Sequence, residues 1–213
     1  MAASRGDDIS SEFTVIERWV NDRGDAGVLA SFEGLRADKA ISEGRYADAC
    51  DALLLAAASD TLNAPTHTRM AGTLALIDAD APRAEKALAA FNATGIHGRL
   101  WDLDRQLLRT GIAALTEPTG AELRSFRDVI DGYRDMSLPY RLAWAVVVLL
   151  ATRGDAELEV AGLVAEAQAI ARRLGAKPIL RDLDRLRAAS AGAVADRAPQ
   201  GSGSARIPSA ARD

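Results

Sequence analysis

The chain has 213 residues, of which 48% are hydrophobic, so it is long enough to bury one sizeable core. Aromatic residues make up only 5% and alanine is abundant, which favours closely packed helices over a β-sandwich. The net charge of -4 does not favour binding to nucleic acid, which depends on neutralising phosphates, and the single cysteine excludes an internal disulfide.

The sequence contains no signal that would direct it to a membrane or out of the cell. Its first residues lack the charged and then apolar pattern of a signal peptide. The most apolar run, near residues 142–151, is too short to span a bilayer, and no basic amphipathic helix is evident. A single cysteine also suits a reducing compartment. We therefore expect a cytoplasmic protein with no membrane partner.

Apolar side chains recur at helical spacing along most of the chain, and Gly, Pro, Asp and Asn residues separate the segments. Before residue 135 the predicted helices are 11–20, 26–42, 45–59, 66–78, 82–93, 100–115 and 120–134. Residues 1–10 are small and polar, and residues 190–213 are rich in Ala, Gly, Ser and Pro, so we expect both segments to be disordered. The folded part is then one helical domain over residues 11–189.

The stretch from Met136 to Ala189 predicts three further helices joined by two tight corners. Ser137 is the expected N-cap of the first, with a proline in its first turn. Gly154 and Gly175 suit the left-handed position that ends a helix. The third helix carries charged residues that we expect to pair on a solvated face. They are Arg181, Asp182, Asp184, Arg185 and Arg187.

The corners inside successive helix pairs recur at a nearly constant interval. They fall at Gly44, Ala81, Pro118 and Gly154, which are 37, 37 and 36 residues apart. One such pair cannot bury its apolar face alone, whereas stacked pairs can. The sequence therefore predicts an all-α protein, a solenoid like that of tetratricopeptide repeats, with about four helix pairs and a C-terminal helix.

Two motifs in this stretch resemble a known family. Residues 138–143 (LPYRLA), a Gly-Asp corner, an Ala-rich helix and residues 171–176 (ARRLGA), followed by Pro178, are similar to the C-terminal helical repeats of bacterial LuxR/MalT-like transcription regulators and of adenylate cyclases fused to an ATPase module. The similarity is specific over residues 137–178. It implies a module that closes a tetratricopeptide-like array and serves signal transduction or transcription regulation.

The other parts of that family have no counterpart in this sequence. It contains no G-x-x-x-x-G-K-[ST] phosphate loop, no cyclase domain and no recognition helix for DNA. The resemblance therefore implies a partner protein, or ATPase, cyclase or DNA-binding domains of a larger protein, as the target of regulation. A fragment, a split gene product and a stand-alone protein all stay open.

No group of residues indicates catalysis, a cofactor or a metal. The two histidines, His67 and His97, have no His or Cys at metal-ligand spacing. Cys50 has no nearby histidine or helix N-terminus to lower its pKa, so we expect a small buried side chain. Local capping is the simplest role for Asp102 and Asp104. We expect no enzymatic activity.

The predicted function is a non-catalytic protein-interaction and regulatory module. Stacked helix pairs would expose a concave groove, lined by the first helix of each pair, where a peptide or partner domain docks. The candidates for this surface are Arg36, Lys39, Arg69, Trp101, Asp102, Arg105 and Arg109. Trp144 is expected in the core. The alternatives are a small-molecule inducer sensor, which needs an apolar pocket, and a small enzyme, which needs a cluster of titratable groups.

Overall fold

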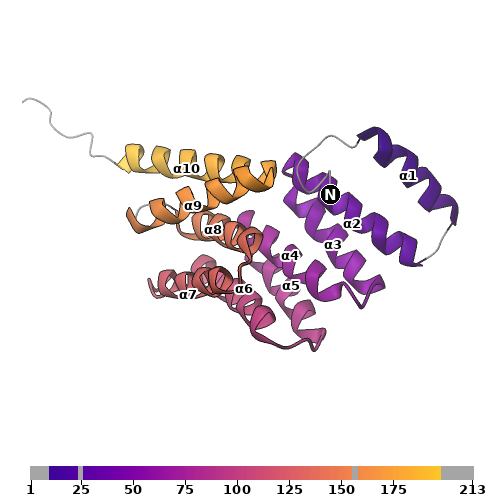
Figure 1. The fold of residues 1–213 in the computed structure, drawn as a ribbon, viewed down its shortest axis with the longest axis horizontal. Coiled ribbons are helices and arrows are strands. Elements are labelled where there is room, and N and C mark those ends of the chain that lie inside the picture. The colour runs from indigo at the N-terminus through magenta and orange to yellow at the C-terminus, as the bar shows by residue number, and fades with distance from the viewer. Residues whose placement is uncertain (1–9, 24–25, 155–157, 198–213) are drawn as a thin grey trace, which may run out of the picture.

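The computed structural model describes residues 10–23, 26–154 and 158–197, and within these ranges it contains ten α-helices and no β-strand (Figure 1). The predicted all-α class is confirmed. The helices are α1 (Ser10–Arg23), α2 (Ala26–Glu43), α3 (Tyr46–Ser59), α4 (Ala64–Ile77), α5 (Ala81–Ala93), α6 (Arg99–Thr116), α7 (Glu122–Asp135), α8 (Pro139–Arg153), α9 (Leu158–Leu174) and α10 (Lys177–Arg197). None of them combines the length and the apolar character that a bilayer crossing requires.

The last helix is longer than the sequence predicted. Helix α10 continues to Arg197, so the disorder expected from residue 190 onward is wrong for residues 190–197. Alanine dominates the end of this helix and has the highest helix propensity, which outweighs the glycine and serine that suggested a tail. The rest of that predicted tail, residues 198–213, and residues 1–9 of the predicted disordered N-terminus lie outside the described residues.

Four helices end in the same hydrogen-bonded corner. The first or second residue after the helix adopts a left-handed conformation, and the next N–H donates at 2.8–2.9 Å to the carbonyl oxygen five residues earlier. The left-handed residues are Gly44, Ala79, Ser137 and Gly175. The predicted role of Ser137 as an N-cap is therefore wrong, because Ser137 ends α7, while Leu138 is the N-cap of α8.

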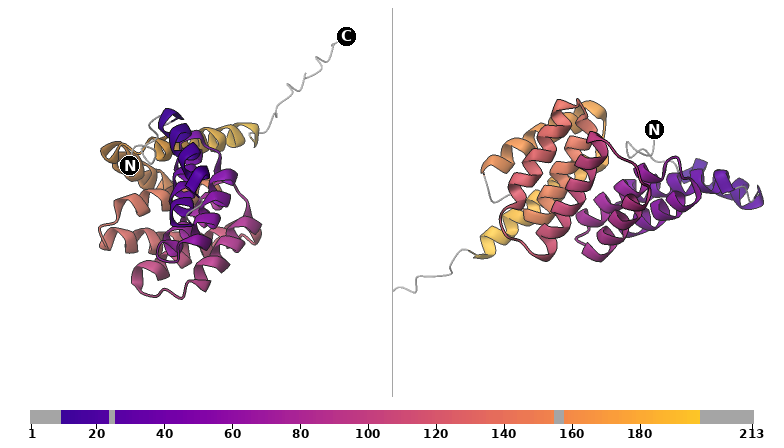
Figure 2. Two further views of the ribbon diagram at one scale, coloured as in Figure 1. Left: turned by 90° about the vertical axis from the view of Figure 1, so that its right-hand side faces the viewer. Right: turned by 90° about the horizontal axis from the view of Figure 1, so that it is seen from below.

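Successive helices pack against one another, and the corners inside α2–α3, α4–α5, α6–α7 and α8–α9 fall where the sequence placed them. The packing also joins helices that are distant along the chain, because α4 contacts both α6 and α8. Figure 2 shows α2–α5 and α6–α9 as two neighbouring groups of helices. As a result α4 is buried from Thr68 to Ile77 and α8 from Leu142 to Leu150, which forms the core.

Glycines allow α4 and α6 to approach closely. A Cβ atom at Gly72 would lie 2.9 Å from Leu108 Cδ1, and a Cβ atom at Gly111 would lie within 3.0 Å of both methyl carbons of Leu76. The two contacts are reciprocal, since each helix offers a glycine to a leucine of the other.

The C-terminal helix closes back on the first helices. Arg181 donates from Nη1 to the Ser42 carbonyl at 2.7 Å and from Nη2 to the Ile41 carbonyl at 3.0 Å, at the end of α2. Tyr46 accepts from Arg181 Nη2 at 2.6 Å and donates to the carboxylate of Asp182, which is 1% exposed. The predicted solvated face is therefore wrong for Asp182, because a tyrosine on α3 holds it in the interior. The other predicted members, Asp184, Arg185 and Arg187, are exposed.

Candidate functional site

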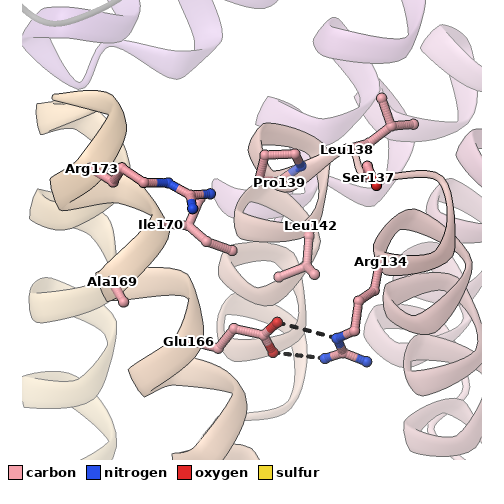
Figure 3. A pocket seen from close by; sticks show the side chains of 9 residues that line it. All are labelled: Arg134, Ser137, Leu138, Pro139, Leu142, Glu166, Ala169, Ile170 and Arg173. Carbon is pink, nitrogen blue, oxygen red and sulfur yellow. Dashed lines mark hydrogen bonds and ion pairs between the residues drawn. The ribbon is translucent and has the colours of Figure 1, made fainter.

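A surface cavity of about 570 Å³ lies where the end of α7, the start of α8 and the second half of α9 meet (Figure 3). Its floor is apolar. Leu142 is buried, and Leu138, Pro139 and Ile170 are partly buried along its sides. Pro139 occupies the first turn of α8, where a missing N–H costs no hydrogen bond, and this places the proline ring at the rim.

An ion pair bridges one end of this α7–α9 cavity. Arg134 on α7 donates from Nε to Glu166 Oε1 at 3.2 Å and from Nη2 to Oε2 at 2.7 Å. These hydrogen bonds raise the pKa of Arg134 above its ordinary value. Because both partners are partly exposed, the pair contributes little to stability, but its two hydrogen bonds link α7 to α9 across the end of the cavity.

A cation, the guanidinium group of Arg173, lies at the other end. Arg173 is exposed, and its side chain extends toward Ile170 in Figure 3. Within the described part of the chain no carboxylate pairs with it. Its place in the last turn of α9 suits the negative end of the helix dipole. The cavity therefore offers an apolar floor beside a guanidinium group that is free to bind a carboxylate.

Three of the predicted groove residues lie elsewhere and apart from the cavity. Arg36 Nη1 pairs with Glu33 at 2.9 Å on α2. Lys39 pairs with Glu43, one turn further along the same helix. Arg109 is exposed on α6. The structure thus brings Arg36 and Lys39 together along one pocket at α2, whereas Arg109 lies on a different helix.

Three more of the predicted residues, which belong to α6, meet around the α5–α6 loop. Arg105 is buried, donates from Nε to Asn92 Oδ1 at 3.1 Å and lies 4.8 Å from the centre of the Phe91 ring. Trp101 packs edge-on against Phe91 at 5.9 Å. Asp102 is exposed and pairs with Arg105 at 3.2 Å. These contacts hold α6 against α5, so the first role of Arg105 and Trp101 is structural.

Asp104 is a fully buried carboxylate, so the expected capping role is wrong. Tyr133 donates its hydroxyl to Oδ1 at 2.7 Å, and Arg141 donates from Nη1 to Oδ2. Burial raises the pKa of Tyr133, and the neighbouring Asp104 charge raises it further. Arg69 on α4 interacts electrostatically with the same carboxylate. This buried charge cluster joins α4, α6, α7 and α8.

The residues considered for chemistry are placed as small structural elements. Cys50 is fully buried, as predicted, and donates from Sγ to the Ala71 carbonyl at 3.1 Å. Burial raises its pKa to about 12, which leaves the thiol protonated at neutral pH. Burial also lowers the pKa of His67. Among the described residues, no three His, Cys, Asp or Glu side chains are grouped to hold a metal.

Sequence reasoning missed the cavity because its polar residues come from separate helices. Arg134 and Glu166 are 32 residues apart and have no spacing that marks them as partners. The one local signal was the Ser137–Pro139 corner, which fixes where α8 begins.

No family model, curated protein or solved structure matches the chain. The resemblance of residues 137–178 to the repeats of bacterial signalling proteins therefore stays a prediction.

Proposed function

We propose that the protein is a non-catalytic module of tetratricopeptide-like helix pairs that binds a partner protein through the α7–α9 cavity. The observation that carries the proposal is the placement of Arg173, a guanidinium group without an ion-pair partner in the described chain, beside an apolar floor. The partner would present a short segment in which an apolar side chain adjoins a carboxylate. Such a segment matches both parts of the cavity at once.

The energies of these contacts favour reversible binding. Burying one leucine-sized side chain against Leu138, Pro139 and Ile170 contributes about 1.5–3 kcal/mol. A hydrogen-bonded contact with Arg173 adds about 1.5–3 kcal/mol, less if solvent screens it. Association costs translational and rotational freedom, which offsets much of this energy, so one such segment binds weakly. Weak binding suits a regulatory contact that must form and dissociate.

The resemblance to LuxR/MalT-like regulators and ATPase-linked cyclases supports a regulatory setting. In this proposal the module controls an ATPase, cyclase or DNA-binding domain, either in a partner or in the same polypeptide. Binding at the α7–α9 cavity would communicate with the target through the helix pairs, which act in signal transduction in the cytoplasm.

A small-molecule inducer is the second candidate for the same cavity. Its volume of about 570 Å³ lies within the range of ligand pockets, roughly 300–1,000 Å³. A small carboxylic acid with an apolar body would use Arg173 and the floor as the peptide does. The experiment below separates the two.

Fluorescence polarisation with a library of short peptides, each pairing an apolar residue with Asp or Glu, tests the proposal. We expect Arg173→Glu to weaken binding at least tenfold, since it replaces attraction by repulsion. Arg172→Glu is the matched control, because Arg172 is exposed on the same turn and does not line the cavity. Equal losses in both variants, or no binding peptide, would contradict the proposal. A carboxylic acid that raises the melting temperature of the wild type, but not of Arg173→Glu, would favour the sensor.

A further inference from the structure

Arg69 is a buried charge for which the described residues supply no oxygen partner. It is 6% exposed, its Nη2 lies 3.6 Å from the sulfur of Met70, and its Nε has no hydrogen-bond partner within the described part of the chain. A guanidinium group stays protonated in proteins and can only donate hydrogen bonds. A buried donor without an acceptor costs about 1–3 kcal/mol, and more when it is charged.

The surrounding charges leave an excess of positive charge. Arg69 and Arg141 face one carboxylate, Asp104, whose two oxygens accept from Tyr133 and Arg141. Tyr133 is neutral, because burial raises its pKa. Arg105, the next arginine on α6, is occupied by Asn92, Asp102 and the Ile96 carbonyl. The buried charge cluster therefore carries one net positive charge.

A second buried donor lies on the neighbouring helix. No described residue accepts a hydrogen bond from Trp144 Nε1, and Trp144 is 1% exposed. Trp144 belongs to α8, which packs against α4, and its ring lies 6.3 Å from that of Tyr140, a residue that interacts electrostatically with Arg69. Both orphaned groups thus need an acceptor, and they belong to two helices that pack against each other.

We propose that Arg69 binds a small monovalent anion in the core between α4 and α8, with Trp144 Nε1 as a second donor. An anion supplies the missing acceptor and cancels the excess charge, whereas a water molecule supplies only the acceptor. The Arg141 side chain is 17% exposed, so the buried charge cluster is not sealed from solvent. This site is separate from the α7–α9 cavity and does not depend on the proposed function.

Chloride is the probe. The melting temperature is measured as sodium chloride replaces sodium gluconate at constant ionic strength. For the wild type we expect a saturable rise of roughly 3–6 °C at a chloride concentration about ten times the dissociation constant. Arg69→Met, which removes the charge and keeps the length of the side chain, loses the rise. Arg109→Met, which removes an exposed arginine of α6, retains it.

The width of the ³⁵Cl NMR signal gives a direct readout, because bound chloride in exchange broadens it. We expect broadening with the wild type and Arg109→Met but not with Arg69→Met. If Arg69→Met does not fold, Trp144→Phe decides, since it keeps an aromatic ring and removes the donor. A several-fold weaker chloride affinity in this variant supports the site. An unchanged affinity, or a wild type with neither a saturable rise nor broadening, would leave water as the acceptor and overturn the proposal.

Discussion

The same substitution, glycine to alanine, is expected to have opposite effects at two helix positions. Gly111 on α6 lies against Leu76 of α4, where an added Cβ would come within 3.0 Å of both leucine methyl carbons. Gly162 lies in the interior of α9, is exposed, and has no heavy atom within 4 Å of an added Cβ. Comparing Gly111→Ala with Gly162→Ala therefore separates the effect of helix propensity on stability from the effect of packing.

The magnitudes follow from these surroundings. Alanine stabilises a helix interior over glycine by about 0.8–1.0 kcal/mol, so Gly162→Ala should raise the melting temperature by about 2–4 °C. At Gly111 the same gain is opposed by overpacking, which costs about 1–3 kcal/mol, and the short contact distance places this site at the upper end. Gly111→Ala should therefore lower the free energy of unfolding by about 2 kcal/mol and the melting temperature by about 4–8 °C.

Urea unfolding and thermal melts of both variants measure the difference. A Leu76→Ala background provides the internal control, because the leucine methyl groups that would clash with alanine at position 111 are then gone. In that background Gly111→Ala should no longer destabilise. If instead Gly111→Ala raised the melting temperature of the otherwise wild-type protein as much as Gly162→Ala, α4 and α6 would have to lie further apart than described, and the reasoning would fail.

Three further substitutions test local features. Ala79 has a φ of 55°, so Ala79→Gly should stabilise by about 0.5–1 kcal/mol in urea unfolding; a destabilised variant would argue against the left-handed corner. Hydrogen bonds from Thr119 lower the pKa of Glu122 to about 2. The ionised Glu122 carboxylate therefore stabilises the fold fully at pH values above the ordinary pKa of glutamate, and this stabilisation is lost as the pH falls toward 2. The melting-temperature gap between wild type and Glu122→Gln should narrow over that range, and a constant gap would contradict this. Tyr46→Phe removes the hydroxyl that donates to buried Asp182 and should lower the free energy of unfolding by about 1.5–3 kcal/mol. A melting temperature equal to that of the wild type would disprove this.

The helices and their corners could be predicted because their causes are local. Helical spacing of apolar residues, Pro139 in a first turn and Gly44 or Gly175 after a last turn each act within a few residues. Ala79 and Ser137 show the limit of that reasoning, since neither is glycine and yet both adopt the left-handed conformation. There the backbone hydrogen bonds of the corner outweigh the preference of the residue.

The buried polar contacts could not be predicted, because a local charge pattern has the same appearance in water and in the core. Asp182 stands next to arginines at helical spacing, as on a solvated face, but its buried partner Tyr46 lies 136 residues away. Asp104 likewise depends on Tyr133 and Arg141. Only the packing of distant helices decides whether such a carboxylate is exposed or enclosed.

The same packing bears on where a partner could bind. The sequence favoured a groove lined by the first helix of each pair, yet α4 is enclosed by its contacts with α6 and α8, and α10 closes back on α2 through Arg181. Arg69, expected to face a partner, is thereby buried. An apolar floor beside a cation occurs instead at the α7–α9 cavity, which Arg173 lines while Arg172, its neighbour in sequence, does not. Comparing charge reversal at these two positions is thus the sharpest way to ask whether this cavity binds a carboxylate.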